Sequence, residues 1–146
     1  MKINELIESI KSDLGNSIQA IDLIREIRRA YIEVDPKNIV KVGEYLYGQK
    51  GCRLITASAM QFKDDYEIYY HFSDDKSGMI LNVHVVLPQN KPEIESLANT
   101  FKAASWIERE MHELYGIDFL NHPEMAPLLS EGNWPEGEFP LSKNGA

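Results

Sequence analysis

The densest group of side chains able to do chemistry is the run from Glu108 to Glu113, which reads Glu-Arg-Glu-Met-His-Glu. Glu108 and His112 are four residues apart, and on a helix this spacing places them on one face. Together with Glu113, and with His122 as a further ligand, they form the basis of one hypothesis, a small metal-dependent hydrolase. Helical zinc hydrolases, however, usually bind the metal through two histidines at this spacing, and the run contains one.

Glu108 stands out for its position on the expected helix. At 100° per residue the apolar stripe consists of Ala104, Ile107, Met111, Leu114 and Tyr115, and Glu108 falls inside it. A carboxylate facing the core is destabilising unless it is paired or protonated. Two interpretations stay open. Either the carboxyl group reaches water at the edge of the stripe, or it is buried and meets an arginine, a lysine or a backbone N–H from the C-terminal tail or a neighbouring subunit.

Other patterns of catalytic or redox sites are missing from the sequence. Cys52 is the single cysteine, which excludes an intramolecular disulfide, a four-cysteine zinc site and an iron–sulfur cluster with cysteine ligands. The sequence has no GxSxG, no glycine-rich phosphate loop and no GxGxxG. We therefore expect a chain without a cofactor or metal of its own that is not catalytic alone.

The composition indicates one acidic, soluble domain. The chain has 146 residues, 43% of them hydrophobic, and a net charge of −8. This length suits a single domain with its own core, and no apolar run is long enough for a transmembrane helix. The acidic balance disfavours nucleic acid as a partner. The single cysteine and the absence of a signal-peptide pattern favour a cytoplasmic location.

Hydrophobic periodicity predicts three helices and four strands. We expect helices over residues 3–14, 36–47 and about 93–115, and strands over residues 29–34, 53–59, 66–72 and 79–86. Residues 18–27 are apolar without a clean period, and they are either extended or a short helix. Asp35 followed by Pro36 predicts the start of the second helix, and Gly116 predicts the end of the third.

The last two strands predict an antiparallel hairpin with one buried face. If Phe72 faces Met79, then Tyr70 faces Leu81 and the remaining pairs on that face are apolar too. A shift by two residues preserves the faces, so the pattern determines which residues share a face and leaves the register open. The predicted fold is α+β, an antiparallel sheet of about four strands packed against helices, with an extended C-terminal tail.

The polar face of this hairpin carries two histidines. We expect His71 and His84 on the exposed side of the sheet, where His84 lies opposite Glu67. An ion pair between His84 and Glu67 is favoured over a role of His84 as a metal ligand.

The C-terminal part differs in character from the rest of the chain. It contains Pro123, Pro127, Pro135 and Pro140 and isolated apolar anchors such as Trp134. We therefore predict a domain over residues 1–120 and an extended, proline-spaced acidic tail over residues 121–146. Residues 108–140 hold eight acidic residues and one basic residue. This stretch is either a solvated surface or a segment that docks on a basic partner.

Residues 106–119, which read WIEREMHELYGIDF, are followed by Asn121-His122-Pro123. This pattern resembles the signature of the 30 kDa subunit of respiratory complex I (NADH dehydrogenase) and of the related subunit of energy-converting, membrane-bound nickel–iron hydrogenases. The residues that match the family pattern are Glu108, Arg109, Glu110, Glu113, Leu114, Tyr115, Gly116, His122 and Pro123. The resemblance extends over residues 1 to about 141.

The resemblance implies a cofactor-free structural subunit in the hydrophilic arm of a complex I-like NADH:quinone oxidoreductase or an energy-converting hydrogenase. Such a subunit packs against the large catalytic-type subunit and the small iron–sulfur subunit, on the inner face of the cell membrane. It supports electron transfer by its neighbours without performing it. The subunit-interface residues that we expect on this basis are Glu108, Arg109, Glu110, Glu113, Gly116, His122 and Pro123. Trp134, an apolar anchor of the tail, is expected to join them.

One position departs from the family pattern. An arginine is expected four residues after the signature histidine, and Ala126 stands there. Together with the short chain, this favours the hydrogenase branch or another archaeal or bacterial complex related to complex I. A third hypothesis is a stand-alone protein-binding module that uses the tyrosine-rich sheet and the tail.

Overall fold

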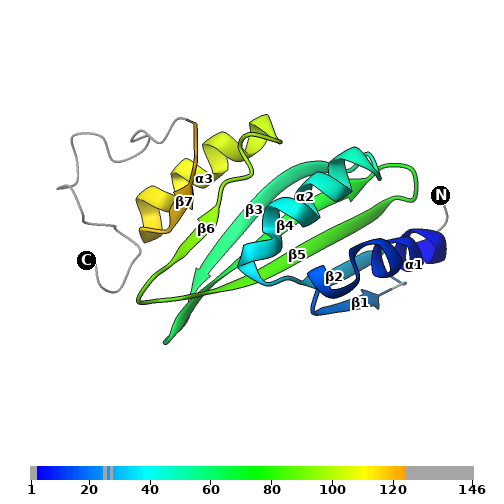
Figure 1. Cartoon of the computed structure of the whole chain (residues 1–146), viewed down its shortest axis with the longest axis horizontal. Helices are drawn as coiled ribbons and strands as arrows, with labels where there is room; N and C mark the ends of the chain where they lie inside the picture. Colours follow the sequence, from blue (N-terminus) through cyan, green and yellow to red (C-terminus); the bar gives the residue numbers. More distant parts are fainter. Residues whose placement is uncertain (1–2, 25, 27, 124–146) are drawn as a thin grey trace.

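A computed structural model describes residues 3–24, 26 and 28–123 of the chain (Figure 1). In chain order the helices and strands are α1 (Ile3–Leu14), β1 (Ala20–Ile24), β2 (Arg29–Glu33), α2 (Ile39–Gly48), β3 (Arg53–Gln61), β4 (Asp65–Asp74), β5 (Met79–Pro88), β6 (Glu93–Glu95), α3 (Lys102–Tyr115) and β7 (Asp118–Leu120). Short 3-10 helices cover Gly15–Ser17 and Pro36–Asn38. None of the described helices is long and apolar enough to cross a membrane.

The main sheet has the strand order β1-β2-β5-β4-β3. The predicted α+β class is confirmed, but the sheet has five strands instead of about four, and β2 runs parallel to β5. The extra strand, β1, lies at the sheet edge with both its faces partly exposed, so its residues lack the alternation that marks a strand. The parallel pair arises because α2 and the β3–β4 hairpin lie between β2 and β5 in the chain.

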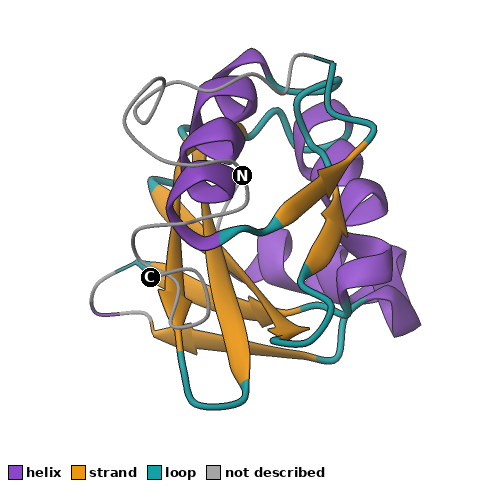
Figure 2. Ribbon diagram, turned by 90° about the vertical axis from the view of Figure 1, so that its left-hand side faces the viewer, coloured by secondary structure: helices purple, strands orange, loops and turns teal. Residues whose placement is uncertain are grey.

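The core lies between one face of the sheet and the helices (Figure 2). Alternate residues of β4 point into it, so Tyr66, Ile68, Tyr70 and Phe72 are at most 2% exposed. Phe72 makes an edge-to-face contact with Phe101 just before α3. All three helices contribute buried residues to the same core, which holds α3 at a fixed position over the sheet.

The hairpin of β4 and β5 has the predicted faces but a register shifted by two residues. Phe72 pairs with Leu81 rather than with Met79. At the turn, β4 continues further than expected, to Asp74, whereas β5 begins at Met79 as predicted. Ser77 closes the four-residue turn by donating two hydrogen bonds to Asp74. The turn geometry therefore decides the register that the apolar pattern left open.

Residues 93–101 are not helical, in contrast to the prediction of a helix from about Glu93. Glu93–Glu95 forms β6, which pairs in parallel with β7 and brings buried Ile94 next to buried Phe119. The alternating Glu-Ile-Glu sequence directly after Pro92 favours a strand, since a proline and a β-branched residue both favour extended backbone. The last helix, α3, consequently begins at Lys102.

The predicted helix boundaries at Asp35 and Gly116 are confirmed. The Asp35 carboxylate accepts a hydrogen bond from the backbone N–H of Lys37 at 3.1 Å. Gly116 ends α3 with a φ of 78°, a left-handed conformation that glycine adopts without strain. This turn directs the chain into β7. The proposed boundary between a domain and a tail at residue 120 stays a prediction, because residues 124–146 lie outside the described part.

Candidate functional site

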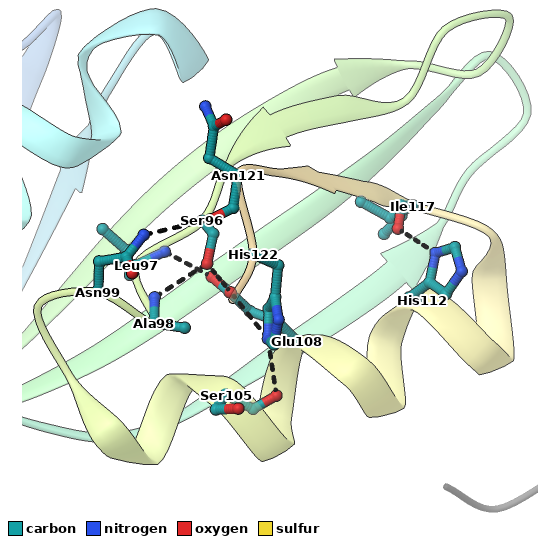
Figure 3. Close-up of polar contacts among 10 residues, drawn as sticks. All are labelled: Ser96, Leu97, Ala98, Asn99, Ser105, Glu108, His112, Ile117, Asn121 and His122. Atoms are coloured by element: carbon teal, nitrogen blue, oxygen red, sulfur yellow. Dashed lines mark hydrogen bonds and ion pairs between the residues drawn. The ribbon is translucent and has the colours of Figure 1, made fainter. Parts of the chain in front are cut away.

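Glu108 is completely buried, with 0% of its surface exposed. The hydroxyl of Ser96 donates a hydrogen bond to its Oε1 at 2.5 Å, and the backbone N–H of Leu97 donates one to its Oε2 at 2.8 Å (Figure 3). The interpretation that its carboxyl group reaches water is therefore wrong. A backbone N–H does bind the carboxyl group, but it comes from the turn after β6 in the same domain.

The turn after β6 depends on these contacts. The hydroxyl of Ser96 also accepts a hydrogen bond from the backbone N–H of Ala98 at 2.9 Å, and the backbone N–H of Ser96 donates to Leu120 in β7. The carboxyl group of Glu108 thus joins α3 to the small sheet of β6 and β7. In this position Glu108 determines how the connection between the main sheet and α3 is folded.

His122, two residues after the end of β7, connects the chain to α3 through a hydrogen bond. Its side chain is 1% exposed, and its Nε2 lies 3.1 Å from the backbone oxygen of Ser105 and 3.8 Å from Oε1 of Glu108 (Figure 3). A carbonyl oxygen only accepts hydrogen bonds, so Nε2 of His122 carries a proton. The residue of the C-terminal segment that lies near Glu108 is therefore a histidine, and the sequence pattern had suggested an arginine, a lysine or a backbone N–H.

Burial governs the protonation of this cluster. It raises the pKa of Glu108 to about 7, although the hydrogen bonds from Leu97 and Ser96 favour the charged form. Tyr70 on β4 is fully buried, and its hydroxyl makes no hydrogen bond within the described structure. Burial, and secondly the carboxyl group of Glu108, raise the pKa of Tyr70 well above 10. The interior near Glu108 is therefore an apolar environment that disfavours charge.

The other residues that the signature singles out occupy different environments. Arg109 and Glu110 on α3 are half-buried, Glu113 is 6% exposed and Pro123 is exposed. Trp134 lies outside the described residues. The structure thus brings Glu108 and His122 together and places Gly116 at the turn that leads to β7.

The geometry does not support the hydrolase hypothesis. Within residues 3–24, 26 and 28–123, no three side chains are grouped in a way that could hold a metal ion. The carboxyl group of Glu108 faces the turn after β6, whereas Nδ1 of His112 donates a hydrogen bond to the backbone oxygen of Ile117 at 2.9 Å. Each side chain therefore has a structural partner.

A second polar cluster lies on the sheet face that points away from the core. His84 on β5 is 8% exposed and contacts Glu33 on β2 through Nδ1 and Glu67 on β4 through Nε2, the latter at 2.6 Å. The ring of Tyr69 stacks on His84, with 4.4 Å between the centroids. The predicted contact with Glu67 is confirmed, but His84 is buried rather than exposed. The contact of His84 with Glu33 was not predicted, because nothing in the sequence pattern indicated that β2 pairs with β5.

A profile of the family described as respiratory-chain NADH dehydrogenase, 30 Kd subunit, matches residues 32–145. The chain belongs to this family. The matched region includes the Glu108 cluster, the whole of α3 and the β3–β5 part of the sheet. The resemblance carried by residues 106–123 therefore holds for most of the chain.

Comparison with other proteins agrees with membership of the 30 Kd subunit family. A subunit of the F(420)H(2) dehydrogenase of Methanosarcina mazei is 35% identical over 148 aligned residues, which cover 99% of this chain and 92% of that protein. A trypsin-resistant fragment of Nqo5 has the same fold, with a TM-score of 0.69 at 15% identity over 85% of this chain and 99% of the fragment. A chain of an archaeal membrane-bound sulfane sulfur reductase has a TM-score of 0.74 at 20% identity, over 98% of this chain and 85% of that one.

The buried hydroxyl of Tyr70 gives a test of how apolar this interior is. Replacing Tyr70 with phenylalanine removes a hydroxyl that has no hydrogen bond, so we expect the free energy of unfolding to stay the same or to rise by about 1 kcal/mol. Urea unfolding of the two proteins followed by circular dichroism measures the change. A loss of more than about 1 kcal/mol would mean that the hydroxyl has a partner in solution.

Proposed function

We propose that the chain is a structural subunit in the hydrophilic arm of a complex I-like oxidoreductase or an energy-converting hydrogenase. It supports electron transfer by neighbouring iron–sulfur subunits and holds no redox group of its own. The observation that carries this proposal is the complete enclosure of Glu108, the most unusual ionisable group of the signature, by its own domain. Such a group positions α3 and does not act on a substrate. The identity to the F(420)H(2) dehydrogenase subunit along nearly the whole chain supports an assembly of this kind.

The partners we propose are the large catalytic-type subunit and the small iron–sulfur subunit of the same complex. The surface of α3 that faces away from the core supports this role, because Trp106 is 54% exposed there and Arg109 and Glu110 lie at its sides. Tryptophan and arginine are enriched among residues that dominate binding at interfaces. Buried Glu108 and His122 act by positioning this surface.

The segment after β7 extends the same proposed interface. Residues 108–140 hold eight acidic residues and one basic residue, a composition that suits a basic partner surface. We infer that Glu113, Pro123 and Trp134 belong to this interface, with Gly116 and His122 directing the segment into it. The chain then lies at the cytoplasmic face of the membrane, held there by its partners.

Co-purification of the complex tests this function. We expect the tagged chain, isolated from mildly solubilised membranes of its own organism, to bring with it a large subunit and an iron–sulfur protein. Mass spectrometry identifies the partners and electron paramagnetic resonance detects the clusters. Isolation of the tagged chain alone, under conditions that keep other membrane complexes intact, would contradict the proposal.

A double variant of α3 tests the proposed surface. Replacing Arg109 and Glu110 with alanine is expected to lower the yield of co-purified partners on the order of tenfold, since charged groups at an interface contribute to both affinity and orientation. The matched control replaces Lys41 and Glu44, one basic and one acidic residue exposed on α2, and it is expected to leave the yield unchanged. Equal yields from the two double variants, both folded by circular dichroism, would place the interface elsewhere.

A further inference from the structure

Three polar side chains on the outer face of the main sheet form a chain of contacts. Ser58, His71 and Asn82 lie on β3, β4 and β5, which are neighbouring strands (Figure 1). Nε2 of His71 lies 3.4 Å from the hydroxyl oxygen of Ser58, and Nδ1 lies 2.5 Å from the amide oxygen of Asn82. A hydroxyl, an imidazole and an amide oxygen in this order correspond to a nucleophile, its base and the group that orients the base.

The register of the sheet holds these side chains together. His71 pairs with Asn82 across β4 and β5, and Ser58 pairs with Tyr69, two residues before His71 on the same face of β4. Tyr70, which lies between them in the sequence, points into the core and is 1% exposed, so this face is the one opposite the core. Ser58 and His71 are therefore diagonal neighbours on paired strands, and the backbone of the sheet sets their distance.

The amide of Asn82 determines which nitrogen of His71 carries the proton. Asn82 is 1% exposed, and its Nδ2 donates a hydrogen bond to the backbone oxygen of Ala30 at 3.3 Å. Because a backbone oxygen only accepts hydrogen bonds, this contact fixes the orientation of the amide. The amide oxygen of Asn82 then faces Nδ1 of His71, and Nδ1 must donate. In the neutral ring the lone pair is consequently on Nε2, the atom that faces Ser58.

The three side chains differ in exposure. Asn82 is buried, His71 is half-buried and Ser58 is exposed. A buried orienting group and a partly enclosed base keep their geometry, whereas an exposed hydroxyl can meet a reagent dissolved in water. The arrangement is therefore suited to chemistry at Ser58 with a small molecule from solution.

We propose that Ser58 is a reactive nucleophile that accepts an acyl group from an activated ester, with His71 as its general base and Asn82 as the positioning residue. The hydroxyl oxygen of Ser58 attacks the ester carbonyl and forms a new C–O bond, and the bond from the carbonyl carbon to the leaving oxygen breaks. The proton of the hydroxyl passes to Nε2 of His71 and then to water, while the leaving group departs as an anion. An ester whose leaving group is a stable anion suits this site, since it needs no further assistance to depart.

Acetylation of the purified 146-residue chain by para-nitrophenyl acetate tests the proposal. Peptide mass spectrometry at a series of times gives the acetylation rate of each serine, and hydroxylamine cleaves esters on serine but not amides on lysine. We expect Ser58 to be acetylated about a hundredfold faster than Ser12, an exposed serine on α1 that serves as the reference. Equal rates at the two serines would overturn the proposal.

Variants of His71 and Asn82 distinguish a base-activated serine from one that is only exposed. Replacing His71 with glutamine keeps a hydrogen-bonding side chain but removes the base, and it is expected to lower the rate at Ser58 to about that of Ser12. Replacing Asn82 with leucine removes the acceptor for Nδ1 and is expected to lower the rate on the order of tenfold. Replacing Asn82 with aspartate is expected to keep the rate within about threefold, since a carboxylate also accepts this proton.

Circular dichroism shows whether each variant is folded. A folded glutamine variant of His71 that acetylates Ser58 as quickly as the wild type would overturn the proposal, and the three contacts would then serve only to join the strands. If the variants do not fold, the ratio of the rates at Ser58 and Ser12 in the wild type still decides. The experiment uses the chain without partners, so its result is independent of whether the proposed complex forms.

Discussion

Replacing Glu108 with glutamine is expected to raise the free energy of unfolding by about 3 kcal/mol at pH 8 and to leave it nearly unchanged at pH 4. The pKa of Glu108 is about 7 in the folded protein, against 4.5 for an ordinary glutamate. The folded state therefore binds this proton more tightly than the unfolded state. The wild-type protein loses stability as the pH rises from 4.5 to 7, whereas glutamine stays neutral throughout.

Urea unfolding of the wild type and the glutamine variant at a series of pH values measures this difference. The contributions of all other titrating groups to the free energy of unfolding are the same in both proteins and cancel. Glutamine can accept the hydrogen bond from Leu97 and donate one to Ser96. Alanine at position 108 can do neither, and it is expected to cost about 2 to 4 kcal/mol at pH 5 through the lost acceptor and the cavity. A glutamine variant that is less stable than the wild type at pH 8 would show that Glu108 is ionised and paired, with His122 as its partner.

The second large effect concerns the cluster around His84. Replacing Glu33 and Glu67 together with glutamine is expected to lower the free energy of unfolding by about 2 to 3 kcal/mol at pH 5.5. Both ring nitrogens of His84 face carboxylate oxygens, so both carry protons and the ring is an imidazolium. Burial by itself lowers the pKa of His84, but the hydrogen bonds to Glu33 and Glu67 outweigh it and hold the pKa above 6.5.

The pH dependence of this effect follows from the raised pKa. The contribution of the cluster is complete below pH 6.5, the ordinary value for histidine, and it is lost as the pH rises through the higher value of the folded state. The difference between the wild type and the double variant should therefore shrink toward pH 9. Replacing Glu44, which is exposed on α2, with glutamine provides a control of the same chemistry. A difference that is constant with pH would contradict the assignment of a charged His84.

The sequence carried enough information to identify the groups that face the core. The position of Glu108 in an apolar stripe placed it on the core side and left its burial as one of two interpretations, and the two faces of β4 followed from strict alternation. Both inferences use the periodic spacing of apolar residues within one element. This spacing predicts which side chains face the core, because buried positions require apolar residues. The partners of Glu108 did not follow, because Ser96 and Leu97 lie in a segment whose pattern suggested a helix.

Long-range pairing was the part that local patterns could not supply. Glu33 and His84 are 51 residues apart, and no periodic feature of β2 indicates that β5 is its neighbour. The histidine at position 84 was expected to be exposed because polar residues alternate with apolar ones along β5. It is buried because Tyr69 stacks on it and two carboxylates enclose it, and such enclosure depends on three strands meeting in one register.

The parallel contact of β2 with β5 also sets an order for synthesis of the chain. The ribosome makes α1, β1 and β2 before β5 exists, so Ile32 can pair with Ile21 of β1 but lacks its partner on the other side until Val83 has left the exit tunnel. The β4–β5 hairpin can close locally, whereas closing the loop from β2 carries a larger entropic cost. During translation, part of the apolar surface of the N-terminal third therefore stays exposed. The core is completed late, after residues 79–88 have been synthesised and have left the ribosome.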